Sequence, residues 1–266
     1  MSRRRSLVGL SLALAATVAL ASTSRAVAAS TAEVKRQGQL VVLTFPHSLS
    51  SFMKAGADGT YTGVDYDLMR AFASRLEVKL VVKPVQSFDD LIPELNAGRG
   101  DVIASSFSIT APRRQLVDFS ASYFPVLIFA MTRQGAGVTV GADLAGKSGC
   151  VVAGSSQEER MNRLASARKH YVKSSGECWG AVAGGAADFT LLDSTAVLAH
   201  MDEYPQVVKA FQLPEADAYG FAVARGSDLR AEVDAFLEQA RQSGFLYQVV
   251  KRHFGERGAE LFKLVK

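Results

Sequence analysis

The order of apolar runs along the chain limits its fold more than any other feature. Between residues 40 and 104 short apolar runs alternate with helical patterns: strands are expected at 40–44, 78–82 and 101–104, and helices at 64–76 and 88–97. In the first of these helices apolar residues recur every four positions, which places them on one face. This βαβαβ order predicts a mostly parallel sheet covered by helices.

A second series of the same kind follows an isolated strand. That strand is expected at 123–131; further strands are expected at 150–153, 170–173 and 189–192, helices at 157–164 and 177–183, another isolated strand at 219–224, and two closing helices separated by Gly244. Two α/β series joined by two unaccompanied strands predict two Rossmann-like α/β lobes with a cleft between them. We expect one lobe to comprise 36–126 plus 222–266, and the other 127–221.

Polar residues follow three of the predicted strands, at the points where the strands end. They are the stretch 105–110, the Gly-Ser-Ser turn at 154–156, and Asp193. In an open parallel sheet, ligands bind beyond the carboxyl ends of the strands. The three loops are therefore expected to converge on one cleft.

The stretch SFSITAPRRQLVDFS places hydroxyls at Ser106, Ser108 and Thr110 ahead of Arg113 and a second arginine. Hydroxyls close to a guanidinium form a polar pocket with a fork of donors, which suits a carboxylate. The same stretch also fits an ordinary helix start, because Thr110 is a good N-cap residue and Pro112 is tolerated in a first helical turn. The spacing alone leaves both interpretations open.

The first residues have the pattern of a secretory signal peptide. Three arginines at 3–5 precede an apolar run at 7–21, and Ala-Val-Ala at 26–28 provides a small-x-small cleavage site. The apolar run is too short for a confident membrane span. We therefore expect residues 1–28 to be removed after export, by either the general secretory or the twin-arginine route.

Charge and histidine spacing exclude several classes of function. Residues 1–28 hold four arginines and no acidic residue, so 26 of the 30 basic residues remain to balance 26 acidic ones. A balanced chain offers no basic face for nucleic acid. The four histidines are scattered and show no metal-ligand spacing, and no nucleophile elbow or phosphate-binding loop occurs. We expect no metal and no cofactor.

Seven blocks, taken in order, resemble the family 3 periplasmic solute-binding proteins of amino-acid ABC transporters over nearly the whole mature chain. They are GVDYDLMRAFASRL, SFDDLIPELNAGRGDVIASSFSITAPR, VDFSASYF, DLAGKSGCVVAGSSQEE, AADFTLLD, YGFAVARGS and SGFLYQVVKRHFG. The resemblance implies the type II periplasmic binding fold, in which two lobes joined by two hinge strands close over one amino acid. It implies a monomer that delivers its ligand to a membrane permease and is not an enzyme.

The resemblance also implies roles for individual residues: Arg113 for the ligand α-carboxylate, Ser108 and the backbone at Ser106 for polar contacts, Ser156 at a helix start, Asp193 for the α-ammonium, and Phe88 and Phe52 as aromatic walls. A helix start attracts an anion, which agrees with the role of Ser156. Simpler roles are also open. Asp193 could cap the following helix, Ser155 could form a capping box with Glu158, and either phenylalanine could be core.

The two cysteines, Cys150 and Cys178, match a pair found in a glutamate/aspartate-type subset of that family. The resemblance therefore implies a disulfide, and two buried free thiols are the alternative. Neither cysteine lies near the cleavage site, so no lipid anchor is expected. A free exported binding protein would be lost from a cell with a single membrane, and we therefore expect a periplasmic location.

The ligand class is expected to be polar, acidic or amide. No acidic residue stands at 45–46, where family members that bind basic amino acids carry one. A second cation for an acidic ligand could come from Lys83, Arg99 or Lys173. Conversely, Leu49 and Val152 could join the two phenylalanines in an apolar pocket.

Two other functions fit the same fold. A cyclohexadienyl (prephenate or arogenate) dehydratase would need a general acid in the cleft besides Asp193, and Glu158 is the candidate. A solute-sensor subunit would bind the same ligand and dock on a receptor. The sequence offers no direct signature of either.

Overall fold

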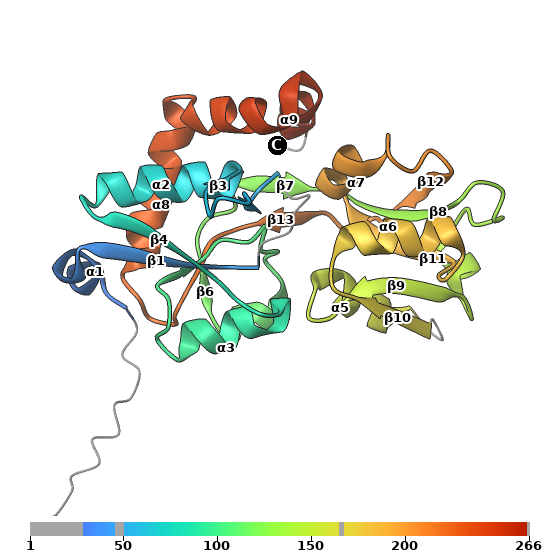
Figure 1. The fold of residues 1–266 in the computed structure, drawn as a ribbon, viewed down its shortest axis with the longest axis horizontal. Coiled ribbons are helices and arrows are strands. Elements are labelled where there is room, and N and C mark those ends of the chain that lie inside the picture. Colours follow the sequence, from blue (N-terminus) through green and yellow to red (C-terminus); the bar gives the residue numbers. More distant parts are fainter. Residues whose placement is uncertain (1–28, 46–50, 165–167, 265–266) are drawn as a thin grey trace, which may run out of the picture.

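A computed structural model describes residues 29–45, 51–164 and 168–264 (Figure 1). The predicted signal peptide and Leu49 lie outside these residues. Among the helices of the described residues, none is both long and apolar enough to cross a membrane. Figure 1 shows two lobes side by side, each built around a sheet. The predicted fold class, two α/β lobes, is therefore confirmed.

The sheet of the first lobe contains three adjacent parallel strands, followed by one antiparallel strand and by an edge strand that runs in the direction of the first three. Its order is β4 (Lys79–Pro84), β1 (Gln39–Thr44), β5 (Val102–Ile103), β14 (Ala222–Val223) and β6 (Asp118–Phe119). The predicted βαβαβ series supplies β1, β4 and β5 in parallel, and β14 pairs antiparallel with both β5 and β6. A strand from the end of the chain therefore completes the first lobe.

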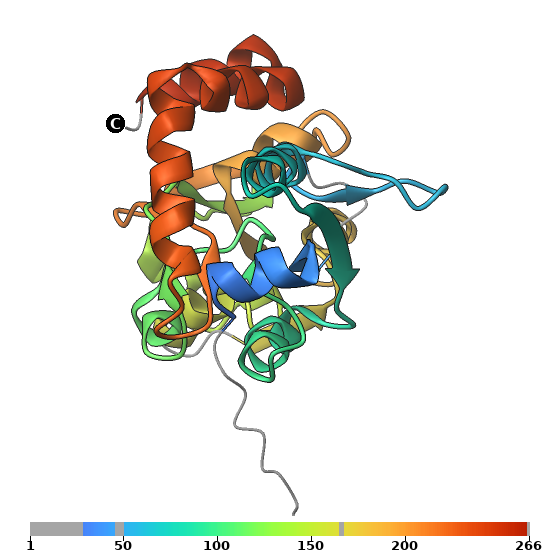
Figure 2. The same cartoon turned by 90° about the vertical axis from the view of Figure 1, so that its left-hand side faces the viewer.

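Helices cover both faces of this sheet. They are α1 (Thr31–Gln37), α2 (Val64–Arg75), α3 (Leu91–Asn96), α4 (Ala111–Arg114), α8 (Leu229–Gln242) and α9 (Phe245–Leu264), with a two-stranded hairpin of β2 (Lys54–Ala55) and β3 (Tyr61–Thr62). Figure 2 shows α9 turning across the end of α8. The helix predicted at 88–97 begins as a 3₁₀ turn, η1 (Phe88–Asp90), and continues as α3.

The start of α2 fixes the segment before it. Gly63 has φ +130°, and a Cβ at this position would lie 2.2 Å from the Phe52 carbonyl oxygen. The N–H groups of Val64 and Asp65 donate to the carbonyls of Ser51 and Phe52. The first turn of the helix thus uses its free donors to hold Phe52 beside the cleft.

The second lobe repeats the pattern. Its sheet has the order β10 (Arg168–Val172), β9 (Ser148–Val152), β11 (Phe189–Asp193), β8 (Ile128–Arg133) and β12 (Val207–Gln212). The first three strands are parallel, and β8 is antiparallel to β11 and β12. The turn η2 (Gly141–Leu144) and the helices α5 (Ser156–Arg163), α6 (Ser175–Gly184) and α7 (Ser194–His200) complete the lobe.

The two isolated strands expected between the lobes are each divided in two. The run predicted at 123–131 forms β7 (Phe124–Val126) and then β8, and the run at 219–224 begins with the last residue of β13 (Asp217–Tyr219) and continues into β14. Strands β7 and β13 pair antiparallel in a separate two-stranded sheet, whereas β8 and β14 belong to the two lobes. An apolar run indicates burial but not direction, so it does not reveal where the chain changes sheets.

A disulfide joins Cys150 of β9 to Cys178 of α6, with Cα atoms 5.3 Å apart. The sequence places Cys178 at the start of its helix, but α6 begins three residues earlier, where Ser174 accepts a hydrogen bond from the Glu177 N–H. Cys178 is therefore one turn into the helix and faces the middle of the strand. The predicted disulfide is confirmed, and the bond lies in a cluster with Met131, Trp179 and other apolar side chains.

We predict that loss of this bond lowers the free energy of unfolding by about 3–4 kcal/mol, because it closes a loop of 28 residues in the unfolded chain. Urea unfolding of the oxidised protein, compared with the same protein kept reduced, measures the difference. The Cys150→Ala/Cys178→Ala double variant should not change further on adding reductant. A difference below about 1 kcal/mol between oxidised and reduced protein would contradict the prediction.

Candidate functional site

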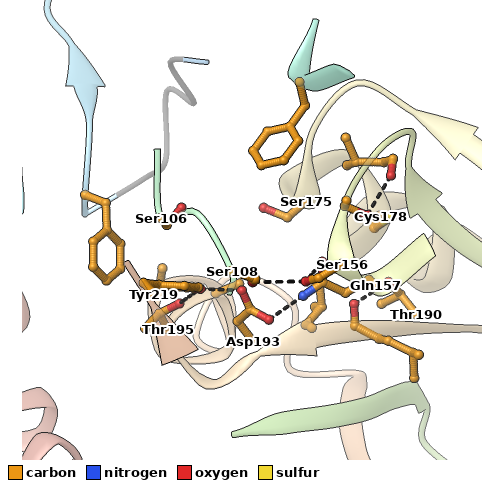
Figure 3. A pocket seen from close by; sticks show the side chains of 18 of the residues that line it. Ser106, Ser108, Ser156, Gln157, Ser175, Cys178, Thr190, Asp193, Thr195 and Tyr219 are labelled. Carbon is orange, nitrogen blue, oxygen red and sulfur yellow. Dashed lines mark hydrogen bonds between the residues drawn. The ribbon is translucent and has the colours of Figure 1, made fainter. Parts of the chain in front are cut away.

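One pocket lies between the lobes, and every predicted ligand-contacting residue lines it (Figure 3). These residues are Phe52, Phe88, Ser106, Ser108 and Arg113 from the first lobe, and Ser156 and Asp193 from the second. The loops after β5, β9 and β11 converge as expected from the carboxyl ends of parallel strands. Their roles toward a ligand remain predictions.

The loop after β5 is held by a buried carboxyl group. Ser106 has φ +44°, a conformation that a residue with a side chain rarely adopts. Its N–H donates to Asp65 Oδ2 at 2.7 Å, and the Tyr123 hydroxyl donates to the other oxygen. Burial raises the pKa of Asp65 to about 6, while the two hydrogen bonds act in the opposite direction. This anchor directs the following residues toward the second lobe.

Arg113 is buried and reaches both lobes. Its Nη1 donates to the Ser108 carbonyl and its Nη2 to the Gly154 carbonyl, each at 2.9 Å. The guanidinium carbon lies 4.1 Å from the Phe107 ring centroid and 5.4 Å from that of Phe88. Burial lowers the pKa of Arg113 to about 10, so the side chain stays charged at neutral pH.

The stretch from Ser106 to Arg113 both starts a helix and lines the pocket. Thr110 is the N-cap of α4 and accepts a hydrogen bond from the Arg113 N–H at 3.4 Å. The same hydroxyl donates to Glu159 of the second lobe at 3.2 Å. The cap therefore also sets the direction from which the arginine side chain enters the cleft.

Further contacts show that the lobes are closed on one another. The Ser156 hydroxyl donates to the Ser108 hydroxyl at 3.0 Å. Gly154 has φ +69°, and a Cβ there would lie 1.4 Å from Asp89 Oδ1 in the first lobe. Only glycine leaves room for the Asp89 side chain at this position.

Asp193 stands at the N-cap position of α7, but its carboxylate makes no capping bond. It accepts hydrogen bonds from the Gln157 amide and the Tyr219 hydroxyl, and that hydroxyl lies 3.2 Å from Thr195 Oγ1 (Figure 3). Burial raises the pKa of Asp193 to about 7, with Asp217 adding to the effect. The carboxylate is thus directed into the pocket.

Gln157 and Tyr219 were missed at the sequence level. Gln157 directly follows Ser156 in the first turn of a helix that begins at the cleft, which is a signal that could have found it. Tyr219 ends β13, between the lobes, and its position became apparent only when the predicted strand at 219–224 proved to be divided.

A buried ion pair lies behind Asp193. Arg160 of α5 donates to Asp217 of β13 at 3.1 Å and to the Ser156 carbonyl at 3.3 Å. The two charged side chains are 9% and 2% exposed. This pair offsets the negative charge of Asp217 next to Asp193 and ties the start of α5 to the strand between the lobes.

Phe52 is both a pocket wall and part of the core. It is buried and lies 5.1 Å from Tyr219, 5.2 Å from Phe124 and 5.4 Å from Phe254 between ring centroids. Phe88 is only half-buried and lines the pocket beside Arg113. Phe52 therefore belongs to the core and also lines the pocket.

The candidate cations and the candidate acid lie elsewhere. Lys83 and Arg99 both pair with Glu94, Lys173 is exposed, and none of the three lines the pocket. Val152 does line it. Among the side chains that the structure describes, no group of acidic, histidine or cysteine residues could hold a metal ion.

Glu158 does not line the pocket either. It accepts hydrogen bonds from the Gly154 N–H at 2.7 Å and the Tyr171 hydroxyl at 2.6 Å. Its own N–H donates to Ser155 Oγ at 3.2 Å, so half of the predicted capping box forms, while the Glu158 carboxylate reaches one residue further back than expected. The acid proposed for a dehydratase therefore serves the loop at Gly154.

The family model of bacterial extracellular solute-binding proteins, family 3, matches residues 41–256. The chain belongs to this family. The resemblance found in the seven sequence blocks is confirmed.

Among curated relatives, the membrane-bound lytic murein transglycosylase F of Pseudomonas syringae pv. syringae (strain B728a) is 32% identical over 84% of this chain and 46% of its own length. The chain spans about half the length of the curated relatives it matches.

Two solved structures share the fold. A mutant of the arginine-binding protein ArgBP from T. maritima has a TM-score of 0.78 and 27% identity, covering 85% of this chain and 99% of its own. The ancestral amino acid-binding protein AncCDT-1, described as a precursor of cyclohexadienyl dehydratase, has a TM-score of 0.76 and 26% identity, covering 85% and 100%.

We predict that Arg160→Met lowers the free energy of unfolding by about 3–5 kcal/mol, because it leaves the buried Asp217 carboxylate without its partner. Asp217→Asn in the same chain should recover most of that loss. Urea unfolding at pH 7 measures both, and Arg163→Met, on the exposed side of the same helix, is the matched control. A loss that the second substitution does not reduce would show that the ion pair is not the cause.

Proposed function

We propose that the chain captures a free amino acid in the cleft, with Arg113 binding the α-carboxylate and Asp193 the α-ammonium. The observation that carries the proposal is that these two opposite charges, one from each lobe, line the same pocket. An α-amino acid carries both countercharges a few bonds apart. A ligand with only one of them would leave the other protein charge unmatched.

The partners of both charges support this assignment. The nearest carboxylate to Arg113 is that of Glu159, at 4.0 Å from Nε, and its two hydrogen bonds go to neutral carbonyls. Asp193 is bonded only to the neutral groups of Gln157 and Tyr219. A zwitterionic ligand can replace these neutral partners with charged ones, which form stronger hydrogen bonds. Ser106, Ser108 and Ser156 add donors, and Phe52 and Phe88 the apolar walls.

Closure over the ligand is proposed to use the two-stranded sheet of β7 and β13 as the hinge. The first lobe would comprise 36–126 plus 222–266 and the second 127–221. Tyr219 of β13 donates to Asp193, so the hinge contacts the site directly. The bonds of Arg113 to both lobes support a closed state that a ligand would stabilise.

In the cell, we propose that the protein is exported, acts as a periplasmic monomer and delivers its ligand to an ABC transporter permease. The family match to extracellular solute-binding proteins supports this role. A sensor role would use the same pocket, and the relatives named transglycosylase F raise an association with cell-wall enzymes.

A dehydratase on the same fold is the second candidate. One observation favours it: a solved structure similar to this chain is described as a precursor of cyclohexadienyl dehydratase. Thermal-shift and calorimetric screening of the twenty amino acids, with prephenate and arogenate in parallel, tests both. Consumption of prephenate with no stabilisation by any amino acid would overturn the binding proposal.

We predict that Arg113→Ala weakens amino-acid binding by about 2–5 kcal/mol, since the ligand carboxylate would lose its charged partner in a buried site. Calorimetry with the ligand found in the screen measures the change. Arg114→Ala, which removes the exposed neighbouring arginine, is the control and should leave the affinity unchanged. Equal effects of the two substitutions would show that Arg113 does not bind the ligand.

We predict that affinity rises between pH 6 and pH 8 by roughly tenfold. Burial raises the pKa of Asp193 to about 7 in the empty pocket, so at pH 6 the carboxyl is mostly protonated and cannot pair with an ammonium. The ligand's own groups do not titrate in this range. Asp193→Asn should bind weakly and without this pH dependence. A wild-type affinity that is flat or falls with rising pH would contradict the assignment.

A further inference from the structure

We propose that Asp65 is a positioning residue for the ligand site, which holds Ser106 in a left-handed backbone conformation whether or not an amino acid is bound. The strain of that conformation then lowers the stability of the folded protein and leaves the affinity for the ligand unaffected. This inference rests on the proposed function, because it concerns the loop that carries the first lobe's side of the pocket.

The backbone conformation of Ser106 calls for a cause. Among the described residues other than glycine, only Glu77 and Ser106 have a positive φ, of +61° and +44°. For a residue with a Cβ, this region is disfavoured by roughly fivefold to thirtyfold. Glu77 is exposed and directly follows the C-cap of α2, where helices commonly end in this conformation. Ser106 follows strand β5 and lines the pocket instead (Figure 3).

The cause is the carboxylate of Asp65, which is held in place from two sides. The residue is fully buried, and its Oδ2 accepts the Ser106 N–H at 2.7 Å. The other oxygen accepts from the Tyr123 hydroxyl. The Tyr123 ring stacks on Phe221 at 4.4 Å between centroids, and its N–H donates to the Tyr219 carbonyl at 2.9 Å. The acceptor for Ser106 is therefore fixed by the start of α2 and by the chain that leads into β7.

This acceptor carries a charge. Burial raises the pKa of Asp65 to about 6, so the carboxyl is ionised at pH 8. Among the ion pairs of the described residues, none includes Asp65, so its charge is stabilised by hydrogen bonds. Hydrogen bonds to a charged acceptor are roughly twice as strong as neutral ones. The bond from the Ser106 N–H can therefore hold a conformation that the backbone alone disfavours.

The residues after Ser106 form the first lobe's side of the pocket. The Phe107 ring lies 4.1 Å from the Arg113 guanidinium carbon, and the Ser108 carbonyl accepts from the same guanidinium. The Ser108 hydroxyl accepts from Ser156 of the second lobe. Because φ at one residue sets the direction of the chain that follows, a change at Ser106 would displace these groups together. Fixing Ser106 in advance prepares them for a ligand, which favours affinity.

Alanine and glycine at position 106 separate this role from a merely structural one. Both lack the hydroxyl, but only alanine is strained at a positive φ. With Asp65 present, the loop has the same conformation before and after binding, so the strain does not enter the affinity. Without the carboxylate, the free loop relaxes, and binding has to restore the left-handed conformation. Alanine then weakens binding relative to glycine.

Calorimetry on Ser106→Ala and Ser106→Gly, each alone and combined with Asp65→Ala, tests the proposal. The probe is whichever of the twenty free amino acids binds the unsubstituted protein most tightly, at pH 8, where Asp65 and Asp193 are both ionised. With Asp65 present, the two variants should differ in affinity by less than about twofold; with Asp65→Ala, glycine should bind roughly fivefold to thirtyfold more tightly than alanine. Asp65→Asn, a neutral acceptor, should give an intermediate ratio. If Asp65→Ala does not fold, that ratio decides, and it should be at least about twice the ratio with Asp65 present.

Urea unfolding without ligand should show the opposite pattern. With Asp65 present, Ser106→Gly should unfold at a higher midpoint than Ser106→Ala, because the folded state forces the strained conformation on alanine. With Asp65→Ala this difference should shrink or reverse, since only the greater flexibility of glycine in the unfolded chain remains. A residue with a merely structural role would lower stability without moving either comparison.

Glu77 provides the matched control, because it also has a positive φ but is exposed and lies outside the pocket. Glu77→Gly should be more stable than Glu77→Ala with and without Asp65→Ala, and the two should bind the probe equally. The inference is overturned if the glycine-to-alanine affinity ratio at position 106 does not change when Asp65 is replaced. If no amino acid binds, the proposed function has failed. The urea comparison then decides the anchor by itself, and a midpoint difference that ignores Asp65→Ala overturns it.

Discussion

The structure depends on placing a charged guanidinium, that of Arg113, where the two lobes meet. Burying such a group is costly unless hydrogen bonds replace its water, and carbonyls from both lobes provide them. The ring of Phe107 faces the guanidinium, adding a cation–π contact. Since one of these carbonyls belongs to Gly154, the arginine favours the closed arrangement of the lobes.

The opposing carboxylate, that of Asp193, is held by hydrogen bonds from Gln157 and Tyr219. The carboxyl lies near a second acid, Asp217, whose charge is offset by Arg160. Asp217 and Tyr219 both belong to β13, so the strand between the lobes carries the groups that set the state of Asp193. In the proposed function Asp193 binds the ligand ammonium, so lobe closure and ammonium binding involve the same strand. A ligand that supplies both charges would therefore stabilise closure as well as occupy the pocket.

Much of the site could be predicted because its residues follow strands. The polar loops after β5, β9 and β11 had to meet once a parallel order was recognised, and Arg113, Ser156 and Asp193 do line one pocket. The residues suggested as a second cation for the ligand do not line the pocket, because their positions depend on how distant elements pack. Lys83 lies 11 positions before Glu94, and Arg99 lies 5 positions after it. Neither spacing predicts an ion pair. The pairing is decided by how β4 and α3 pack.

The sequence by itself determined the two α/β series and the two lobes, because apolar periodicity and turn residues act over a few positions. The family followed from the resemblance of the seven blocks. Short or half-exposed strands such as β6 and β12 were not predicted. Only the tertiary structure decided where the chain changes sheets, which way Cys178 faces, and that Gln157, Tyr219 and His200 share a pocket with Arg113. These outcomes depend on contacts between residues distant in the chain, such as Arg160 with Asp217, and no local pattern encodes such a distance.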